Sequence, residues 1–174
     1  AAVNSTFYRN AANATIGGGG AIALAGPTQG ILQYTTIAAN SAAFGAIYDD
    51  GASGGALFLS KTILAANSGG NCAGVLVTSY YNLSDDSFCG GVFDATDLSN
   101  ATLPLGAYQN NGGPTSTLLP LTGNQAVDRV PPGDCTYDHD QRGATRPAGG
   151  ACDSGAVELG GVIDVIFVDG FDLR

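Results

Sequence analysis

The residues best suited to acid–base chemistry gather near the C-terminal end of the sequence. The tripeptide Asp138-His139-Asp140 places two carboxylates beside the only histidine, and Arg142, Arg146 and Glu158 follow. General-base catalysis and metal binding both use a histidine with carboxylate neighbours. These side chains are therefore the first candidates for a functional site.

The rest of the sequence does not complete a catalytic centre around His139. There is no second histidine and no serine-nucleophile motif for a His-based metal site or a catalytic triad. We expect His139 to be a loop residue and we assign no catalytic residue to this chain. Arg142 and Arg146 instead suit bidentate ion pairs that fix an irregular segment, and Glu158, the only glutamate, is their best candidate partner.

Polysaccharide cleavage is the alternative chemistry. A lyase needs a base that abstracts a proton next to a carboxylate and a cation that acidifies it. Arg9 and Lys61 are the only bases in the first half of the chain, and Asp49-Asp50 could approach Lys61. We favour a solvated surface ion pair for these charges. A glycosidase needs two carboxylates at a defined separation, which the many aspartates supply by chance.

Metal ions and cofactors have little support in the sequence. Asp85-Asp86 offers two adjacent carboxylates, whereas calcium takes six to eight oxygen ligands. We expect no cofactor, with Ca²⁺ as the weaker alternative. The four cysteines contain no close C-x-x-C pair of the kind that binds zinc.

Composition indicates one all-β domain. The 174 residues include 27 Gly and only 12% charged residues, with no Met or Trp, while Thr, Val and Ile are plentiful. A net charge of −9 disfavours nucleic-acid binding, which depends on clustered Lys and Arg. No apolar run reaches the ~20 residues of a membrane span.

A short strand-like run that ends on Asn recurs along the first half. Asn10, Asn40 and Asn67 end these runs, at separations of 30 and then 27 residues. Repeats of about 20–30 residues with short strands are typical of a solenoid, because stacked coils bury apolar residues that one coil leaves exposed. We expect a right-handed parallel β-helix in which Asn40 and Asn67 occupy equivalent turns and hydrogen-bond along the stack.

The cysteines indicate an oxidising compartment. Four cysteines allow three pairings, and two pairs have the same separation of 17 residues. We expect the disulfides Cys72–Cys89 and Cys135–Cys152, each closing a glycine-containing loop and each worth roughly 3 kcal/mol.

The second half is less regular. Six of the seven prolines fall in it, which excludes a long helix. We divide the chain into β-helix coils at 1–93, a C-terminal coil and cap region of the same domain at 94–160, and a strand-like tail at 161–174. A solenoid end exposes unpaired edges and apolar interior. The disulfide-tied segment is therefore expected to cap the last coils.

Several blocks, taken in order, resemble the choice-of-anchor Q domain of secreted bacterial proteins. The blocks are Thr62–Gly69, Cys72, Tyr81–Leu83, Cys89, Asn111–Thr115, Ala126–Asp128 and Asp140–Glu158. The resemblance implies a pectate-lyase-like β-helix on an exported protein. The tail segment Ile166–Asp172 is similar to the endings of many secreted bacterial proteins and is a candidate sorting element.

We therefore expect a secreted or cell-surface module without catalysis of its own, serving structure, adhesion or glycan contact. The alternative is the terminal part of a polysaccharide lyase or glycoside hydrolase whose catalytic residues lie mostly upstream. Expected partners are a polysaccharide or cell-surface glycan and the upstream part of the precursor. The aromatic side chains to inspect for sugar stacking are Tyr8, Tyr34, Tyr48, Tyr80 and Tyr81.

Overall fold

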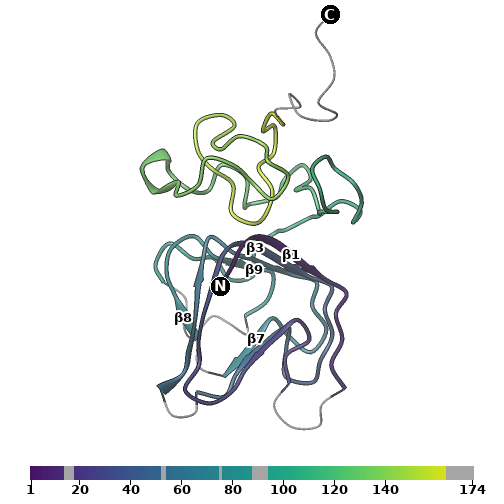
Figure 1. Ribbon diagram of the computed structural model, residues 1–174, viewed down its shortest axis with the longest axis vertical. Coiled ribbons are helices and arrows are strands. Elements are labelled where there is room, and N and C mark those ends of the chain that lie inside the picture. Colours follow the sequence, from purple (N-terminus) through teal and green to yellow (C-terminus); the bar gives the residue numbers. More distant parts are fainter. Residues whose placement is uncertain (14–17, 52–53, 75, 88–93, 164–174) are drawn as a thin grey trace, which may run out of the picture.

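The computed structural model describes residues 1–13, 18–51, 54–74, 76–87 and 94–163 (Figure 1). Within these ranges the regular secondary structure is mainly β-strand, with short 3-10 structure and no α-helix, which confirms the prediction of an all-β protein. The elements are β1 (Ala2–Tyr8), β2 (Ile22–Leu24), β3 (Gln29–Ala38), β4 (Ile47–Asp49), β5 (Ala56–Ser60), β6 (Ile63–Ala65), β7 (Cys72–Gly74), β8 (Leu76–Thr78), β9 (Leu83–Ser84) and η2 (Pro132–Asp134).

The named strands pair in parallel and form two sheets. The larger sheet has the order β8-β5-β3-β6-β9 with β1 beside β3, and the smaller has the order β2-β4-β7. Parallel neighbours need a long connection, and here the chain visits the other sheet between them. Ala2 lies opposite Leu32, and Thr36 lies opposite Ile63. The repeats found in the sequence are therefore segments that pair with one another.

The main core contains apolar side chains from both sheets. Ile37, Leu57, Leu59 and Leu64 of the larger sheet pack with Ile47 of the smaller one, and all are at most 1% exposed. In β5 buried and partly exposed residues alternate, as expected for a strand with one face on a core. Neither sheet could bury these side chains without the other.

The chain bends at the same places in successive strands. Two sets of residues other than glycine have a positive φ, and each set repeats at the separations of the strand pairing. The sets are Asn4, Tyr34 and Lys61, and Arg9, Ala39 and Ala66. Left-handed backbone is rare outside glycine, so its recurrence at equivalent positions indicates that stacking imposes it. The bend at Lys61 separates β5 from β6, and both pair with β3.

A line of asparagine side chains runs across the strand pairs next to the second set of bends. The backbone N and Nδ2 of Asn10 both donate to Asn40 Oδ1 at 2.9 Å. Asn40 repeats this arrangement one strand further, with its N and Nδ2 at 2.8 and 3.1 Å from Asn67 Oδ1. Asn40 is fully buried. Each asparagine thus satisfies donors that the turn would otherwise leave unpaired.

Acidic side chains continue this line beyond Asn67. Asn67 Nδ2 donates to Asn71 Oδ1 at 2.7 Å, and Asn71 Nδ2 donates to Asp85 Oδ1 at 2.8 Å. Asp85 also accepts from the backbone N of Ala66, and Asp86 from that of Asn71. The pair considered as a calcium site therefore contacts backbone amides of the stacked turns.

Residues 94–163 form an irregular layer beside the strands, on the side where β1, β3 and β9 lie (Figure 1). Its first part continues the stacking, since Leu98 pairs in parallel with Leu83 and the Ala101 amide donates to Ser84 O. We call residues 128–163, which follow this part, the clasp.

The clasp does not sit only on the last strands, and the expected end cap is corrected in this respect. Thr6 Oγ1 of β1 donates to Gln141 Oε1 at 2.6 Å, and the Ala156 amide donates to Thr36 Oγ1 of β3 at 3.0 Å. Ser154 Oγ donates to Tyr81 O near β9 at 2.7 Å. The clasp therefore crosses the stack from its first strand to its last, because the repeated bends present equivalent polar groups along one flank.

The asparagine line yields the first testable prediction. Asn40→Ala should lower the free energy of unfolding by about 2–3 kcal/mol, because the Asn10 amide donors and the acceptor Phe7 O lose their buried partner. Asn13→Ala, at an exposed position, is the control and should change it by less than about 0.5 kcal/mol. Urea denaturation measures both. Equal effects of the two variants would contradict the structural role of this line.

Candidate functional site under the clasp

The charged residues singled out in the sequence meet where the clasp covers the larger sheet. Arg146 Nη1 lies 2.8 Å from Glu158 Oε2, and both side chains are fully buried. Glu158 also accepts from the backbone N of Ala148 and of Asp153, at 2.7 and 2.9 Å. Arg146 donates further to Asp153 O and Gly155 O. A buried ion pair needs such additional hydrogen bonds to offset its desolvation.

The second arginine forms a separate pair beside the first. Arg142 Nη2 lies 2.8 Å from Asp140 Oδ2, and Nη2 donates to Glu158 O at 2.7 Å. Asp140 also accepts from the amides of Arg142, Ala144 and Glu158. Arg142, Arg146 and Glu158 are thus brought together, and each arginine pairs with its own carboxylate.

Tyr34 connects this network to the sheet. It lies at the bend of β3, is fully buried, and has the Arg146 Cζ atom 4.4 Å from its ring centroid. This distance is typical of a cation–π contact. Burial raises the pKa of Tyr34 above its usual value, with the Arg146 charge acting in the opposite direction. The tyrosine therefore stays neutral and serves as an apolar platform for the guanidinium.

Lys61 corrects the expectation of a solvated surface pair. It occupies the equivalent bend one strand further and is only 6% exposed, with Nζ 5.6 Å from the Tyr34 ring centroid. Burial lowers the pKa of Lys61, and the charge of Asp134 opposes this shift. The backbone O of Lys61 accepts from the Gly155 amide of the clasp at 2.8 Å. Lysines with such a lowered pKa occur in active sites, but the clasp covers this one.

The Cys135–Cys152 disulfide closes one side of the clasp, as the spacing predicted. Cys152 and Val130 exchange both backbone hydrogen bonds at 2.8 Å, and both residues pack with Tyr34. Cys72 is not a free thiol, while its predicted partner Cys89 lies outside the described residues. The described disulfide therefore belongs to the same cluster as the ion pairs.

Asp153 is the titratable group of this cluster with a pKa near neutrality. Burial raises its pKa from 3.8 to about 6, and the Glu158 charge acts in the same direction. The amides of Leu159 and Asp128, which donate to it at 2.6 and 2.8 Å, and the Arg146 charge oppose the shift. Desolvation dominates because the side chain is almost entirely removed from water.

His139 lies apart from this cluster. It is exposed, and its backbone O accepts from Asn4 Nδ2 at 2.8 Å. Among the described residues no group of three or more His, Cys, Asp or Glu side chains is placed to hold a metal ion.

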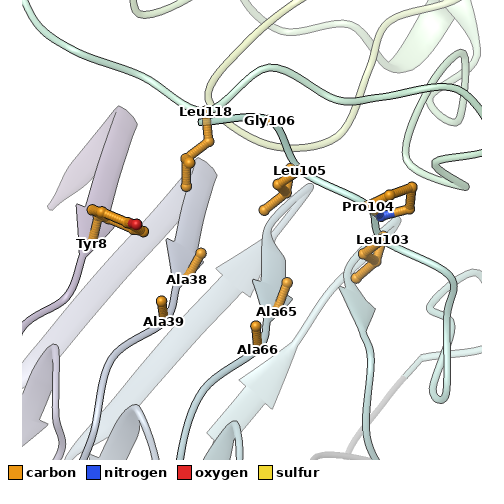
Figure 2. Close-up of a pocket in the computed structure, with 10 residues that line it drawn as sticks. All are labelled: Tyr8, Ala38, Ala39, Ala65, Ala66, Leu103, Pro104, Leu105, Gly106 and Leu118. Atoms are coloured by element: carbon orange, nitrogen blue, oxygen red, sulfur yellow. The ribbon is translucent and has the colours of Figure 1, made fainter. Parts of the chain in front are cut away.

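An apolar groove of about 330 Å³ lies where residues 103–118 approach the C-terminal ends of β1, β3 and β6 (Figure 2). Leu105 and Leu118 lie on one side of it, and Tyr8, Ala39 and Ala66 on the other. No Asp, Glu, Lys, Arg or His is among the described residues that line the groove, and Tyr8 supplies the hydroxyl of its lining.

The tyrosines proposed for sugar stacking have different environments. Tyr8 stacks on Tyr108 with ring centroids 4.6 Å apart, and Tyr48 packs against Phe44. Tyr81 donates its hydroxyl to Asp134 Oδ2 at 2.7 Å, while Tyr80 is 56% exposed. Tyr108, which sequence reasoning missed, is 44% exposed. Tyr80 and Tyr108 therefore present the larger accessible aromatic surfaces.

Comparisons with known proteins found no matching family model, no matching curated protein and no matching solved structure. The described part of the chain contains no helix with the length and apolarity to cross a membrane.

The buried ion pair yields a second prediction. Glu158→Gln should lower the free energy of unfolding by about 3–5 kcal/mol, because it leaves the Arg146 guanidinium buried without a counter-charge. Asp138→Asn removes an exposed carboxylate of the same segment and should change stability by less than about 0.5 kcal/mol. Urea denaturation of both variants is the measurement. A loss below about 1 kcal/mol for Glu158→Gln would contradict the proposed role of the pair.

Asp153 yields a third prediction, on pH dependence. A carboxyl whose folded pKa is about 6 and whose unfolded pKa is 3.8 binds its proton more tightly when folded. Its contribution to stability is therefore full below pH 3.8 and is lost as the pH rises through 6. Relative to Asp153→Asn, the wild type should lose stability between pH 4 and pH 7, by at most about 1.4 kcal/mol per pH unit. Parallel stability profiles of the two proteins would contradict this assignment.

Proposed function

We propose that this chain is a right-handed parallel β-helix module of an exported bacterial protein, without catalysis of its own, serving cell-surface structure, adhesion or glycan contact. The β-helix assignment is supported by parallel pairing at 30 and 27 residues and by the line of Asn10, Asn40 and Asn67. The resemblance to the choice-of-anchor Q domain is part of this proposal, as is the sorting role of the tail, whose residues 164–174 lie outside the described ranges.

The proposal that this chain has no catalysis of its own rests on one observation. Arg142, Arg146 and Glu158 are buried in the network under the clasp, whereas His139 is exposed and apart from them. Arg146 and Glu158 are fully buried against each other, and Lys61 is covered. A polymer substrate cannot reach these atoms while the clasp is in place. The enzyme alternative would therefore depend on residues elsewhere in the protein.

A location outside the cytoplasm is supported by the way the clasp is held. The Cys135–Cys152 disulfide packs on Tyr34, in the same cluster as the buried charges. Disulfides persist in oxidising compartments and are rare in the cytosol. Under reducing conditions the clasp would lose one of its constraints. The module is thus suited to the extracellular side, where it remains oxidised.

Glycan contact has an accessible aromatic surface to support it. Tyr108 is held by stacking on Tyr8 and keeps 44% of its surface exposed. Sugar rings pack their apolar faces on such aromatic surfaces, which bury large areas at low entropic cost. The net charge of −9 favours neutral over acidic polysaccharides as ligands.

A fourth prediction tests the disulfide. The double variant Cys135→Ser and Cys152→Ser should lose about 3 kcal/mol of unfolding free energy and become sensitive to protease within residues 128–163. Mass spectrometry of a limited digest locates the cuts, and wild-type protein treated with a thiol reductant should give the same cuts. An unchanged melting temperature and unchanged protease resistance would show that the disulfide does not stabilise the clasp.

A fifth prediction tests the function. Incubation with neutral and acidic polysaccharides should give no new reducing ends and no unsaturated products. Affinity electrophoresis should detect retardation by a neutral polysaccharide that Tyr108→Ala abolishes, with Tyr137→Ala, at a comparably exposed tyrosine, as the control. Cleavage that Lys61→Met abolishes would overturn the non-catalytic proposal in favour of a lyase. Absence of retardation by every polysaccharide would exclude glycan contact and leave the structural role.

A further inference from the structure

The two ends of the strand stack differ in how far their apolar side chains are covered. At the end formed by β1 and β2, a hollow of about 230 Å³ is lined by apolar residues, among them Phe7, Ile22 and Leu24. Past β9 at the other end, Leu98, Ala101 and Leu103 pack on Leu83. The end at β1 and β2 therefore leaves core-type side chains exposed to water, which has a free-energy cost that scales with their area.

Matched positions in neighbouring strands show what this end lacks. Phe7 lies opposite Ile37, and Ile22 lies opposite Ile47. Ile37 and Ile47 are fully buried, whereas Phe7 and Ile22 are only partly buried. All seven residues of β1 are partly exposed. The difference has a simple cause: Ile37 and Ile47 have a strand on each side, and Phe7 and Ile22 have one on a single side.

The outer edges of β1 and β2 have no strand partner in the described part of the chain. Among the described strands, β1 pairs only with β3 and β2 pairs only with β4. Exposed edge strands normally carry Lys, Pro or a bulge that blocks further pairing. β1 has the sequence AVNSTFY and β2 has IAL, with no charged residue and no proline. Both edges are thus free of the features that would prevent another strand from pairing.

The asparagine line indicates which strand direction a neighbour at this end would need. The N and Nδ2 of each asparagine donate to the Oδ1 of the next one along the chain, from Asn10 to Asn40 and from Asn40 to Asn67. Within the described ranges no donor contacts Asn10 Oδ1, the equivalent acceptor at the open end. A preceding asparagine in the same turn conformation would supply both donors. An antiparallel or two-fold related neighbour would not present them in this arrangement.

We propose that the β1–β2 end is a docking surface for one further parallel β-coil, supplied by polypeptide joined ahead of Ala1. The coil would place strands beside β1 and β2, an inward apolar side chain over Phe7, and an asparagine whose N and Nδ2 donate to Asn10 Oδ1. Ala1 and Ala2 themselves line the hollow, so polypeptide joined there begins at the surface to be covered. The proposal rests on the strand stacking and is independent of the surface role proposed above.

The test is an N-terminal extension with a second copy of residues 1–30. The register of 30 residues between β1 and β3 then places the copied strand opposite β1 and the copied asparagine opposite Asn10. We expect amide hydrogen exchange in Ala2–Tyr8 to slow at least tenfold and the melting temperature to rise. An extension of equal length whose copy carries Phe7→Asp and Ile22→Asp is the control, and it should change neither quantity.

Two outcomes would overturn the proposal. Equal exchange rates in Ala2–Tyr8 for the unextended, extended and control proteins would show that the end does not accept a parallel coil. Light scattering that finds the unextended chain dimeric, with these amides already protected, would assign the surface to a second copy instead. Polysaccharide cleavage, or a failure to bind any polysaccharide, would contradict the proposed function and leave this test unaffected. The test measures amide exchange and oligomeric state instead.

Discussion

The Arg146–Glu158 ion pair is the contact on which the conformation of the clasp depends. Both side chains are fully buried, so each charge would be strongly destabilising without the other. The guanidinium lies over the ring of Tyr34, which belongs to the sheet, while the carboxylate accepts amides of the clasp. Both members of the pair belong to the clasp, so the pair holds the clasp together internally, and the contact of Arg146 with Tyr34 joins it to the sheet. The hydrogen bonds around it explain why a segment with little regular secondary structure has a defined conformation.

Parallel stacking creates the surface that the clasp covers. Strands paired at a constant register bring equivalent bends side by side, and the left-handed residues Tyr34 and Lys61 lie in adjacent strands for this reason. Their side chains leave the sheet on the same flank. The clasp can then bind several strands at once and protect their bends from water. Stacking and clasp are thus linked, since the first supplies the platform and the second shields the bends at Tyr34 and Lys61.

Much of the strand region could be predicted from the sequence, because parallel pairing repeats residue types at the spacing of the paired strands. The separation of Asn40 and Asn67 reports the register directly, and equal cysteine spacing indicated Cys135–Cys152. The position of the clasp could not be predicted, because composition identifies an irregular segment without specifying which flank it covers. Lys61 was misjudged because charged side chains are usually solvated, whereas its burial comes from residues far away in the chain, such as Gly155.

The most direct measurement of the central claim is a double-mutant cycle of Arg146→Met and Glu158→Met, followed by urea denaturation. If the pair holds the clasp in its folded conformation, each single variant leaves one buried charge unpaired, and the double variant removes both. We expect a coupling energy of about 2 kcal/mol or more, with the double variant more stable than either single variant. Additive losses, with a coupling energy near zero, would contradict it.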